Sequence, residues 1–237
     1  MKRNNWVGFV LVLLLSVLFA GGKPLLARKS TDEAERARKA ADVLAEVMAI
    51  PEGSIPDELM ERARGIAVIP HVVKGAFGVG GRYGKGLISQ RQPNGKWSTP
   101  AFIEIGGGSF GFQIGVQETD VVLVFTNEAG IKTLLDGKVT LGADASVAAG
   151  PVGRQATADT DIKFSSAIYS YSRNKGLFAG VSLEGAAIMM DDDANRRVYG
   201  KDVSGQEILL LHKVRSNPIV APFMIALEKY SPSRRIS

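Results

Sequence analysis

Hydrophobic and polar residues alternate with two different periods along this chain, and the period changes near residue 65. Before that point, apolar residues recur at spacings of three and four, as on one face of a helix: Ala37, Ala40, Ala41, Leu44, Val47 and Met48. This spacing predicts an amphipathic helix over residues 30–50. Ser30 and Glu33 have the spacing of a capping box at its start, and Pro51 is expected to end it. A second short helix is expected over residues 55–65.

After residue 65, short apolar and β-branched runs separated by turn residues predict a series of strands. Asn94-Gly95 is the strongest hairpin signal in the chain. Residues 117–120 are expected to form the next turn, before a buried strand over 121–126, and residues 162–173 alternate strictly as in a strand. Helical patterns recur in four later segments: residues 127–137, 194–200, 204–211 and 217–230.

This order of elements predicts an α+β fold. Strands joined by short hairpins favour an antiparallel sheet over a parallel, doubly wound one. Glycine inside strands is typical of bulges, barrel corners and close backbone approach, so the sheet is expected to be curved. We therefore expect a curved antiparallel β-sheet, able to close or nearly close into a barrel, flanked by N- and C-terminal helices.

The first residues are predicted to direct export. Lys2 and Arg3 precede an apolar run over residues 6–20 that is short for a membrane span, as in a signal peptide. The small residues near Ala20 suggest a signal peptide over residues 1–22, with cleavage after Ala27 as the alternative. An uncleaved inner-membrane anchor is the other interpretation. Either way we expect an exported protein, in the periplasm or at the outer-membrane periphery of a bacterium.

Composition narrows the function classes. The chain has 237 residues, a formal net charge of +5 and no cysteine, which excludes disulfides, thiolate metal sites and a cysteine nucleophile. The excess of positive charge permits attraction to anionic lipid headgroups. A nucleic-acid-binding protein would usually carry a denser basic face with interleaved aromatic residues, and no such face is visible in the sequence.

Two glycine-rich stretches imitate phosphate-binding loops. Residues 106–111, GGGSFG, have the spacing of a dinucleotide-binding loop, but such a loop must leave a strand and begin a helix. Here the pattern that follows is that of another strand, with small residues on one face, so we interpret it as a glycine-lined strand. Residues 78–86, GVGGRYGKG, fail the spacing of a Walker A loop and are interpreted as a glycine-rich strand and turn.

Candidate catalytic residues are few. His71 and His212 are the only histidines, and neither lies in a recognisable nucleophile or metal motif. Residues 191–193 are three consecutive aspartates, typical of a helix N-terminus. Asp159 and Asp161 alone are a weak argument for calcium. We predict that the protein is not an enzyme and has no cofactor or metal site.

Five ordered blocks carry a resemblance to a known family. They are RARGIAVIPHVVKGAFGVGGRYGKG (62–86), WSTPAF (97–102), SFGFQIG (109–115), LGADASVAAGPVG (141–153) and GLFAGVSLEG (176–185), with Asn195 and Tyr199-Gly200 after them. The chain resembles the SYLF lipid-binding domain family, in its bacterial exported form, as a single domain over residues 28–237. One departure is Val198, where the family often has an aromatic residue. The resemblance implies phospholipid binding, phosphoinositides and actin in eukaryotic members, and no catalysis.

The candidate lipid-binding residues come from a basic hairpin and the N-terminal helix. The hairpin contributes cations without an intervening acid and two aromatic rings suited to headgroup depth: Lys74, Arg82, Tyr83, Lys85, Arg91, Lys96 and Trp97. The helix contributes Arg36 and Lys39, but residues 32–50 hold five acids against three bases, so packing against the sheet is an equal alternative. The hairpin cations could likewise only solvate a sheet edge. The expected partner is a phospholipid membrane surface; the alternative is an envelope assembly protein whose glycine-rich sheet binds a second copy or a protein partner.

Overall fold

The computed structural model describes most of the chain after residue 24. The described residues are 25–50, 54–77, 79–109, 115–152, 165–174, 177–200, 202–211 and 213–232. The chain divides into two compact units, Met1–Asp32 and Glu33–Ser237. In the first unit only residues 25–32 are described, as the start of helix α2 (Leu25–Met48). The predicted signal peptide over residues 1–22 lies outside the described part, and none of the helices within that part is long and apolar enough to cross a bilayer.

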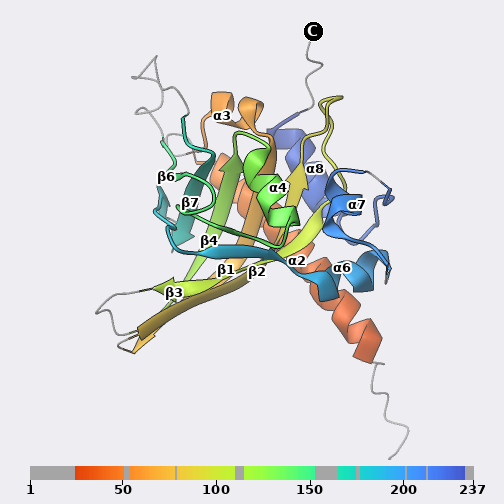
Figure 1. Cartoon of the computed structure of the whole chain (residues 1–237), viewed down its shortest axis with the longest axis horizontal. Helices are drawn as coiled ribbons and strands as arrows, with labels where there is room; N and C mark the ends of the chain where they lie inside the picture. The colour runs from red at the N-terminus through yellow and green to blue at the C-terminus, as the bar shows by residue number, and fades with distance from the viewer. Residues whose placement is uncertain are drawn as a thin grey trace, which may run out of the picture. The chain divides into compact units, whose positions relative to one another are not determined.

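Glu33–Ser237 is built on one nine-stranded sheet (Figure 1). The strand order is β5-β9-β3-β2-β1-β4-β7-β6, and β8 pairs with β7 off this path. All pairings are antiparallel except β6 with β7. The strands are β1 (Gly65–Phe77), β2 (Val79–Gln90), β3 (Ala101–Ser109), β4 (Gly115–Phe125), β5 (Lys138–Thr140), β6 (Val147–Ala149), β7 (Ile168–Asn174), β8 (Leu177–Gly180) and β9 (Ala187–Met190).

The predicted α+β fold with a curved, mainly antiparallel sheet between terminal helices is confirmed. The sheet is strongly curved but open, because no pairing joins its end strands β5 and β6 among the described residues. The closed barrel that the sequence allowed is therefore not formed by the described strands.

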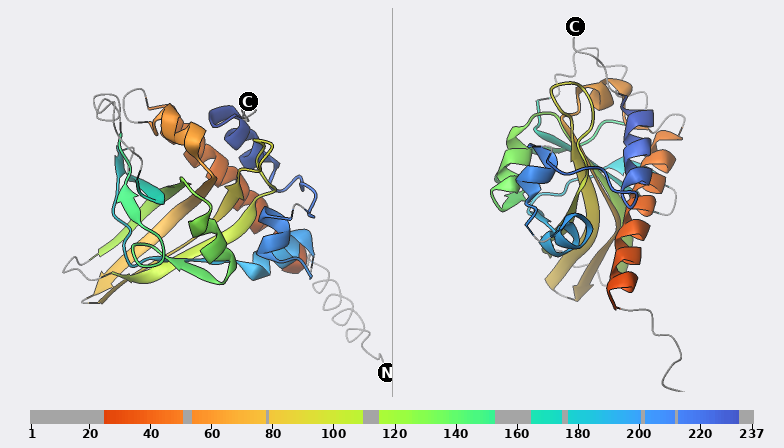
Figure 2. Two further views of the ribbon diagram at one scale, coloured as in Figure 1. Left: turned by 45° about the horizontal axis from the view of Figure 1, so that its top comes forward. Right: turned by 90° about the vertical axis from the view of Figure 1, so that its right-hand side faces the viewer.

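Each face of the sheet carries its own hydrophobic core. Helix α2, α3 (Asp57–Arg62) and α8 (Ala221–Tyr230) cover one face, which we call the α2 face. Helices α4 (Ala129–Leu135) and α7 (Gly205–Leu209) cover the other, the α4 face (Figure 2). Side chains alternate between the two cores along each central strand, as the pleat requires. On β2, for example, Leu87 lies in the first core and Ile88 in the second.

Helix α2 confirms the predicted apolar face but not the predicted start. Ala37, Ala40, Leu44 and Val47 are fully buried against the sheet. The helix begins at Leu25, so Ser30 lies inside it and does not cap it. Glu33, the other half of the expected capping box, is buried and receives hydrogen bonds from Arg197 instead. A long-range ion pair has taken the place of the local cap.

Two turn predictions had opposite outcomes. Asn94-Gly95 does reverse the chain between β2 and β3: Gly95 has φ 82°, a conformation that glycine adopts without strain. The turn predicted at residues 117–120 is wrong, because these residues continue β4. In the GGGSFG stretch, residues 106–109 belong to β3 and the next described element is β4; residues 110–114 lie outside the description.

Glycine on the α4 face permits close packing at an irregularity in β1. The β1–β2 register shifts between Val68 and Val73, and His71 lies in this bulge with φ 52°. A Cβ on Gly86 would lie 2.2 Å from the carbonyl oxygen of Val68 and 2.7 Å from the Cα of Ile69. The expectation that glycine in these strands serves close backbone approach therefore holds at Gly86.

Candidate functional site

Lys74 and Arg82 form a cross-strand pair of cations near the β1–β2 turn. They are directly opposite in the β1–β2 register, so their side chains lie on the same face, the α4 face that also carries Val72 and Ile88. Neither forms an ion pair with any described carboxylate, and the Nε of Arg82 is buried without a hydrogen-bond partner there. Burial lowers the pKa of Arg82. Like charges placed directly opposite destabilise a sheet, so this pair needs another explanation.

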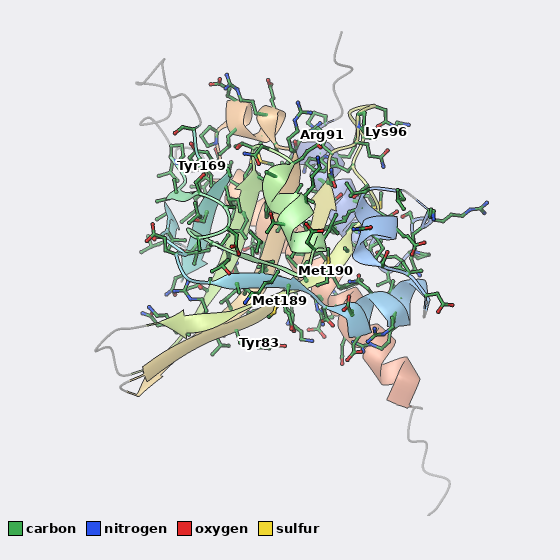
Figure 3. The ribbon with its side chains drawn as sticks, in the orientation of Figure 1. Tyr83, Arg91, Lys96, Tyr169, Met189 and Met190 are labelled. Carbon is green, nitrogen blue, oxygen red and sulfur yellow. The ribbon has the colours of Figure 1, made fainter. Side chains whose placement is uncertain are left out.

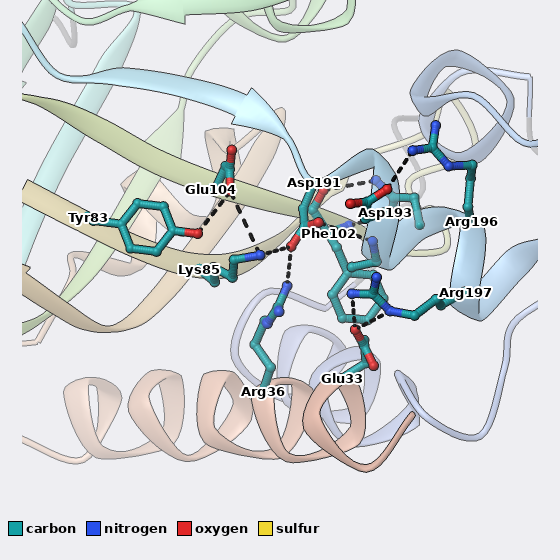
Figure 4. Close-up of polar contacts among 12 residues, drawn as sticks. Glu33, Arg36, Tyr83, Lys85, Phe102, Glu104, Asp191, Asp193, Arg196 and Arg197 are labelled. Atoms are coloured by element: carbon teal, nitrogen blue, oxygen red, sulfur yellow. Dashed lines mark hydrogen bonds and ion pairs between the residues drawn. The ribbon is translucent and has the colours of Figure 1, made fainter. Parts of the chain in front are cut away.

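The cations on the α2 face are neutralised by a shared carboxylate (Figure 4). Oδ2 of Asp191 lies 2.9 Å from Nζ of Lys85 and 2.9 Å from Nη1 of Arg36, and Asp191 is 5% exposed. Lys85 is also 3.8 Å from Oε2 of Glu104, which accepts a 3.1 Å hydrogen bond from the Tyr83 hydroxyl. Lys85 and Arg36 therefore connect α2 and β2 to the start of helix α6 (Asp192–Tyr199), directly after β9.

The pKa values of Asp191 and Lys85 are both shifted in the direction that favours the charged form. Burial by itself would raise the pKa of Asp191, but hydrogen bonds from Lys85, the Ala194 N–H and Arg36 lower it below the ordinary value. Burial would lower the pKa of Lys85, yet the hydrogen bond and charge of Asp191 raise it. Both shifts favour the charged pair, so Lys85 is held by an internal partner rather than left free for a ligand.

Asp191 also connects the network to helix α6 (Asp192–Tyr199). Its Oδ1 accepts from the N–H of Ala194 and so caps the helix, as the run of three aspartates predicted. One turn further, Arg197 donates to Oε1 of Glu33 at 2.6 and 3.0 Å, and this bond raises the pKa of Arg197. No local pattern in the sequence predicts the Arg197–Glu33 contact, because the two residues lie 164 positions apart.

Asn195, one of the residues that carry the family resemblance, forms two hydrogen bonds to the backbone of β3. Its side-chain oxygen accepts from the N–H of Phe102 at 2.8 Å, and its amide nitrogen donates to the carbonyl of Phe102 at 3.0 Å. Asn195 is buried, and Phe102 precedes the first β3 residue that pairs with β9. The motif residue therefore anchors α6 to β3 and has a structural role.

Arg91 and Trp97 lie inside the protein, which contradicts their assignment to a membrane-facing site. They are 7% and 6% exposed, and the guanidinium of Arg91 stacks 4.5 Å from the ring of Trp97. Arg91 donates to backbone carbonyls that include those of Ala63 and Ser231, and Trp97 Nε1 donates to Ser231 at 2.8 Å. The prediction that these two residues face a membrane is therefore wrong, and both instead bind the C-terminal segment.

The remaining predicted residues do not form one patch. Lys96 is exposed in the turn beside Arg91, at the opposite end of β2 from Arg82, and Figure 3 shows it far from Tyr83. Lys39 is 2.9 Å from Glu35 in an exposed pair one helical turn apart. Tyr83 is 52% exposed near the β1–β2 turn. Of the nine predicted residues, only Lys74, Arg82 and Tyr83 lie on the outer part of the β1–β2 hairpin, the two cations on the α4 face and Tyr83 on the α2 face.

Bare backbone surrounds Tyr83 on the α2 face. Gly75, Gly81 and Gly108 are aligned across β1, β2 and β3. A Cβ would meet nothing within 4 Å at Gly75 or Gly108, and only a carbonyl oxygen at 3.9 Å at Gly81. With Val73 43% exposed in the next row, this glycine row is an open surface without side chains. No cluster of His, Cys, Asp and Glu suited to a metal ion occurs among the described residues.

The fold and the ordered motifs define an SYLF-type α+β domain. Comparison with known families and proteins agrees: residues 106–230 match the Ysc84 family model, described as "Las17-binding protein actin regulator". The chain belongs to this family.

Several curated proteins are similar to the chain. It is 39% identical over 179 residues to SH3 domain-containing YSC84-like protein 1 of Xenopus laevis and 36% identical over 179 residues to that of Homo sapiens. It is 38% identical over 186 residues to LAS seventeen-binding protein 3 of Saccharomyces cerevisiae. These alignments cover 73%, 73% and 76% of this chain, and 53%, 52% and 40% of the relatives. The chain thus spans about half the length of the vertebrate relatives and less of the yeast one.

Proposed function

We propose that this protein is a non-catalytic binding protein that docks on anionic phospholipid surfaces through the outer part of its β1–β2 hairpin. The observation that carries the proposal is the Lys74–Arg82 pair, two like charges in register with no described counter-ion. Phosphate oxygens would satisfy both cations, and a guanidinium can bind a phosphate through two parallel hydrogen bonds. The half-exposed ring of Tyr83 has the amphipathic character of residues that settle at headgroup depth.

The predicted contribution of the N-terminal helix is reduced accordingly. Arg36 is paired with Asp191 and Lys39 with Glu35, and the described apolar face of helix α2 is buried in the protein. We propose that α2 supports the sheet while the hairpin meets the lipid. The exported setting is part of the proposal: it rests on the apolar run over residues 6–20, and there the ligand would be a bulk anionic lipid.

Flotation of the full chain with vesicles tests this proposal. The measured quantity is the difference in bound fraction between phosphatidylglycerol-containing vesicles and pure phosphatidylcholine vesicles, which subtracts any binding by the apolar N-terminal run. Each basic residue near an anionic surface contributes ~1 kcal/mol, so the double variant Lys74→Gln/Arg82→Gln should lower partitioning roughly 30-fold. The matched control Lys39→Gln/Lys96→Gln removes the same charge elsewhere and should have a much smaller effect.

Two results would contradict the proposal. Wild-type flotation by the Lys74/Arg82 variant would show that the pair does not bind lipid. An equal loss in both double variants would show only general charge attraction. Flotation that ignores lipid charge, together with concentration-dependent oligomers in sedimentation, would favour the second candidate: binding of a second copy or a protein partner on the open glycine row. The names of the yeast relative and of the family, which refer to Las17 binding, favour that class as well.

A further inference from the structure

A cleft of about 740 Å³ opens where β4 and β7 separate. Its walls come from the β1 bulge, β4, β7 and β8 and include His71, Glu118, Asp120, Arg173, Asn174 and Leu177. The volume is within the range of small-ligand and peptide pockets. Neither Lys74 nor Arg82 is among its lining residues, although Lys74 is the register partner of Gln117 at its edge, and the cleft plays no part in the function proposed above.

The cleft borders a strand edge that has no ladder partner among the described residues. The β4–β7 ladder runs from Phe125 to Asp120 and stops there. Residues 117–119 continue β4 and pair only with β1. Alternate residues of a strand direct their N–H and C=O groups to opposite sides, so part of this segment's backbone points away from β1. An unpaired edge of this kind can accept an added strand from another chain.

The described charges in and around the cleft are predominantly negative. Arg173 is shared by two carboxylates: it donates to Asp120 at 2.8 and 3.2 Å and also pairs with Glu46 of α2. Among the described residues, the ion-pair partner of Glu118 is the imidazole of His71, whose Nδ1 lies 2.5 Å from Oε1. With Glu46, three carboxylates thus face the guanidinium of Arg173, the imidazole of His71 and, one strand away, the ammonium of Lys74 opposite Gln117, in a chain whose formal net charge is +5.

The cleft is also held in a fixed shape and has an apolar wall. The backbone N–H of His71 donates to Oδ1 of Asp120 at 3.1 Å, which fixes the bulge against β4. Leu177 is 79% exposed, the most exposed of the large hydrophobic side chains described. A small organic cation would use the carboxylates alone, whereas an extended peptide would use the carboxylates, the strand edge and Leu177 together.

We propose that this cleft binds an extended segment of a partner protein that carries a basic side chain. The segment adds to the free edge of β4 at residues 117–119, its cation meets Glu118, and an apolar side chain packs on Leu177. Backbone pairing provides most of the contact, and the carboxylates select for a basic segment over an acidic one.

Fluorescence anisotropy of a labelled peptide of alternating lysine and valine tests the proposal with the full chain at low salt. Two comparison peptides separate the contributions: one replaces the central valines by proline, which removes ladder N–H donors, and one replaces lysine by glutamate. The lysine peptide should bind, the proline peptide at least tenfold more weakly, and the glutamate peptide not measurably. The amide NMR shift of Glu118, whose N–H points away from β1, should change when the lysine peptide is added.

Matched variants locate the charge effect. Glu118→Gln should weaken the lysine peptide by about fivefold, the upper end for one exposed ion pair. Glu58→Gln removes a carboxylate of similar exposure, 59% against 57%, from α3 and should change nothing. Unchanged binding by Glu118→Gln, or equal affinity for the proline peptide, would overturn the proposal. So would full displacement of the peptide by spermidine at equal concentration, which would assign the cleft to small cations.

Discussion

Replacing Arg91 by alanine should lower the free energy of unfolding by roughly 3–5 kcal/mol. The guanidinium is buried and donates to the carbonyls of Ala63 at 3.0 Å and Gly95 at 3.2 Å. It also donates to the carbonyls of Ser231 at 3.2 Å and Pro232 at 3.1 Å. Alanine would leave these acceptors without their donor, and each buried acceptor left unsatisfied costs ~1–3 kcal/mol. Because the Pro232 contact is only partly buried, water can replace it, and the total falls below the sum.

Urea unfolding of the full chain measures this cost. Trp97 is the natural probe, because its ring stacks on Arg91 and its N–H is bonded to Ser231. Arg91→Lys keeps the charge but loses the planar fork, so we expect about half of the loss. Arg62→Ala is the control: its guanidinium is 56% exposed in a pair one helical turn from Glu58, and exposed pairs of this kind contribute ~0.5 kcal/mol or less.

Equal shifts of the urea midpoint by Arg91→Ala and Arg62→Ala, at the same m-value, would refute this role of Arg91. A reduced m-value would instead indicate that the variant changes the compactness of one of the two states, and the comparison would then be repeated by heating. There, ~1 kcal/mol corresponds to about 2–4 °C in a domain of this size, so the alanine variant should melt at least 6 °C lower.

Two further predictions concern the network and the sheet. Asp191 has a lowered pKa in the folded state, so its charge stabilises the protein above about pH 4 and the effect is lost as the pH falls through the folded pKa. The difference in unfolding free energy between wild type and Asp191→Asn should therefore shrink from pH 6 to pH 3 in urea titrations; a constant difference would contradict this. Gly86→Ala should cost ~3 kcal/mol, because its Cβ would meet the fixed carbonyl of Val68, whereas Gly75→Ala has free space and should cost little. Equal melting temperatures of the two alanine variants would argue against that close contact.

Local patterns in the sequence predicted the elements that local chemistry determines. The spacing of Ala37, Ala40 and Leu44 predicted the buried face of α2, and Asn94-Gly95 predicted a turn that needs a positive φ. In such cases the residue types themselves determine the local structure, here the buried helix face and the positive φ. Contacts between distant segments carry no such signal, so the pairing of Glu33 with Arg197 could not be predicted.

The wrong turn at residues 117–120 has a physical explanation. Polar runs are typical of turns because turns are exposed, but they are equally suited to a strand that extends beyond its core. Glu118 projects from the exposed part of β4, whereas Val122 and Val124 of the same strand are buried. The polar residues at 117–120 therefore indicated exposed positions correctly. The error was to interpret these positions as a chain reversal. The same exposed part of β4 forms the edge of the cleft.

The candidate site shows why a run of cations in sequence does not define a binding surface. Lys74, Arg82, Lys85 and Arg91 are free of acids between them along the chain, yet folding gives them different partners. Lys85 meets Asp191, which follows it by 106 residues, and Arg91 meets carbonyls of the C-terminal segment. The β1–β2 register places Lys74 beside Arg82 and supplies no carboxylate among the described residues. A cation becomes a candidate for an external anion only when the fold has left it without an internal one. Among these four cations and the described residues, that condition is met by Lys74 and Arg82, whose mutual repulsion an external phosphate would relieve.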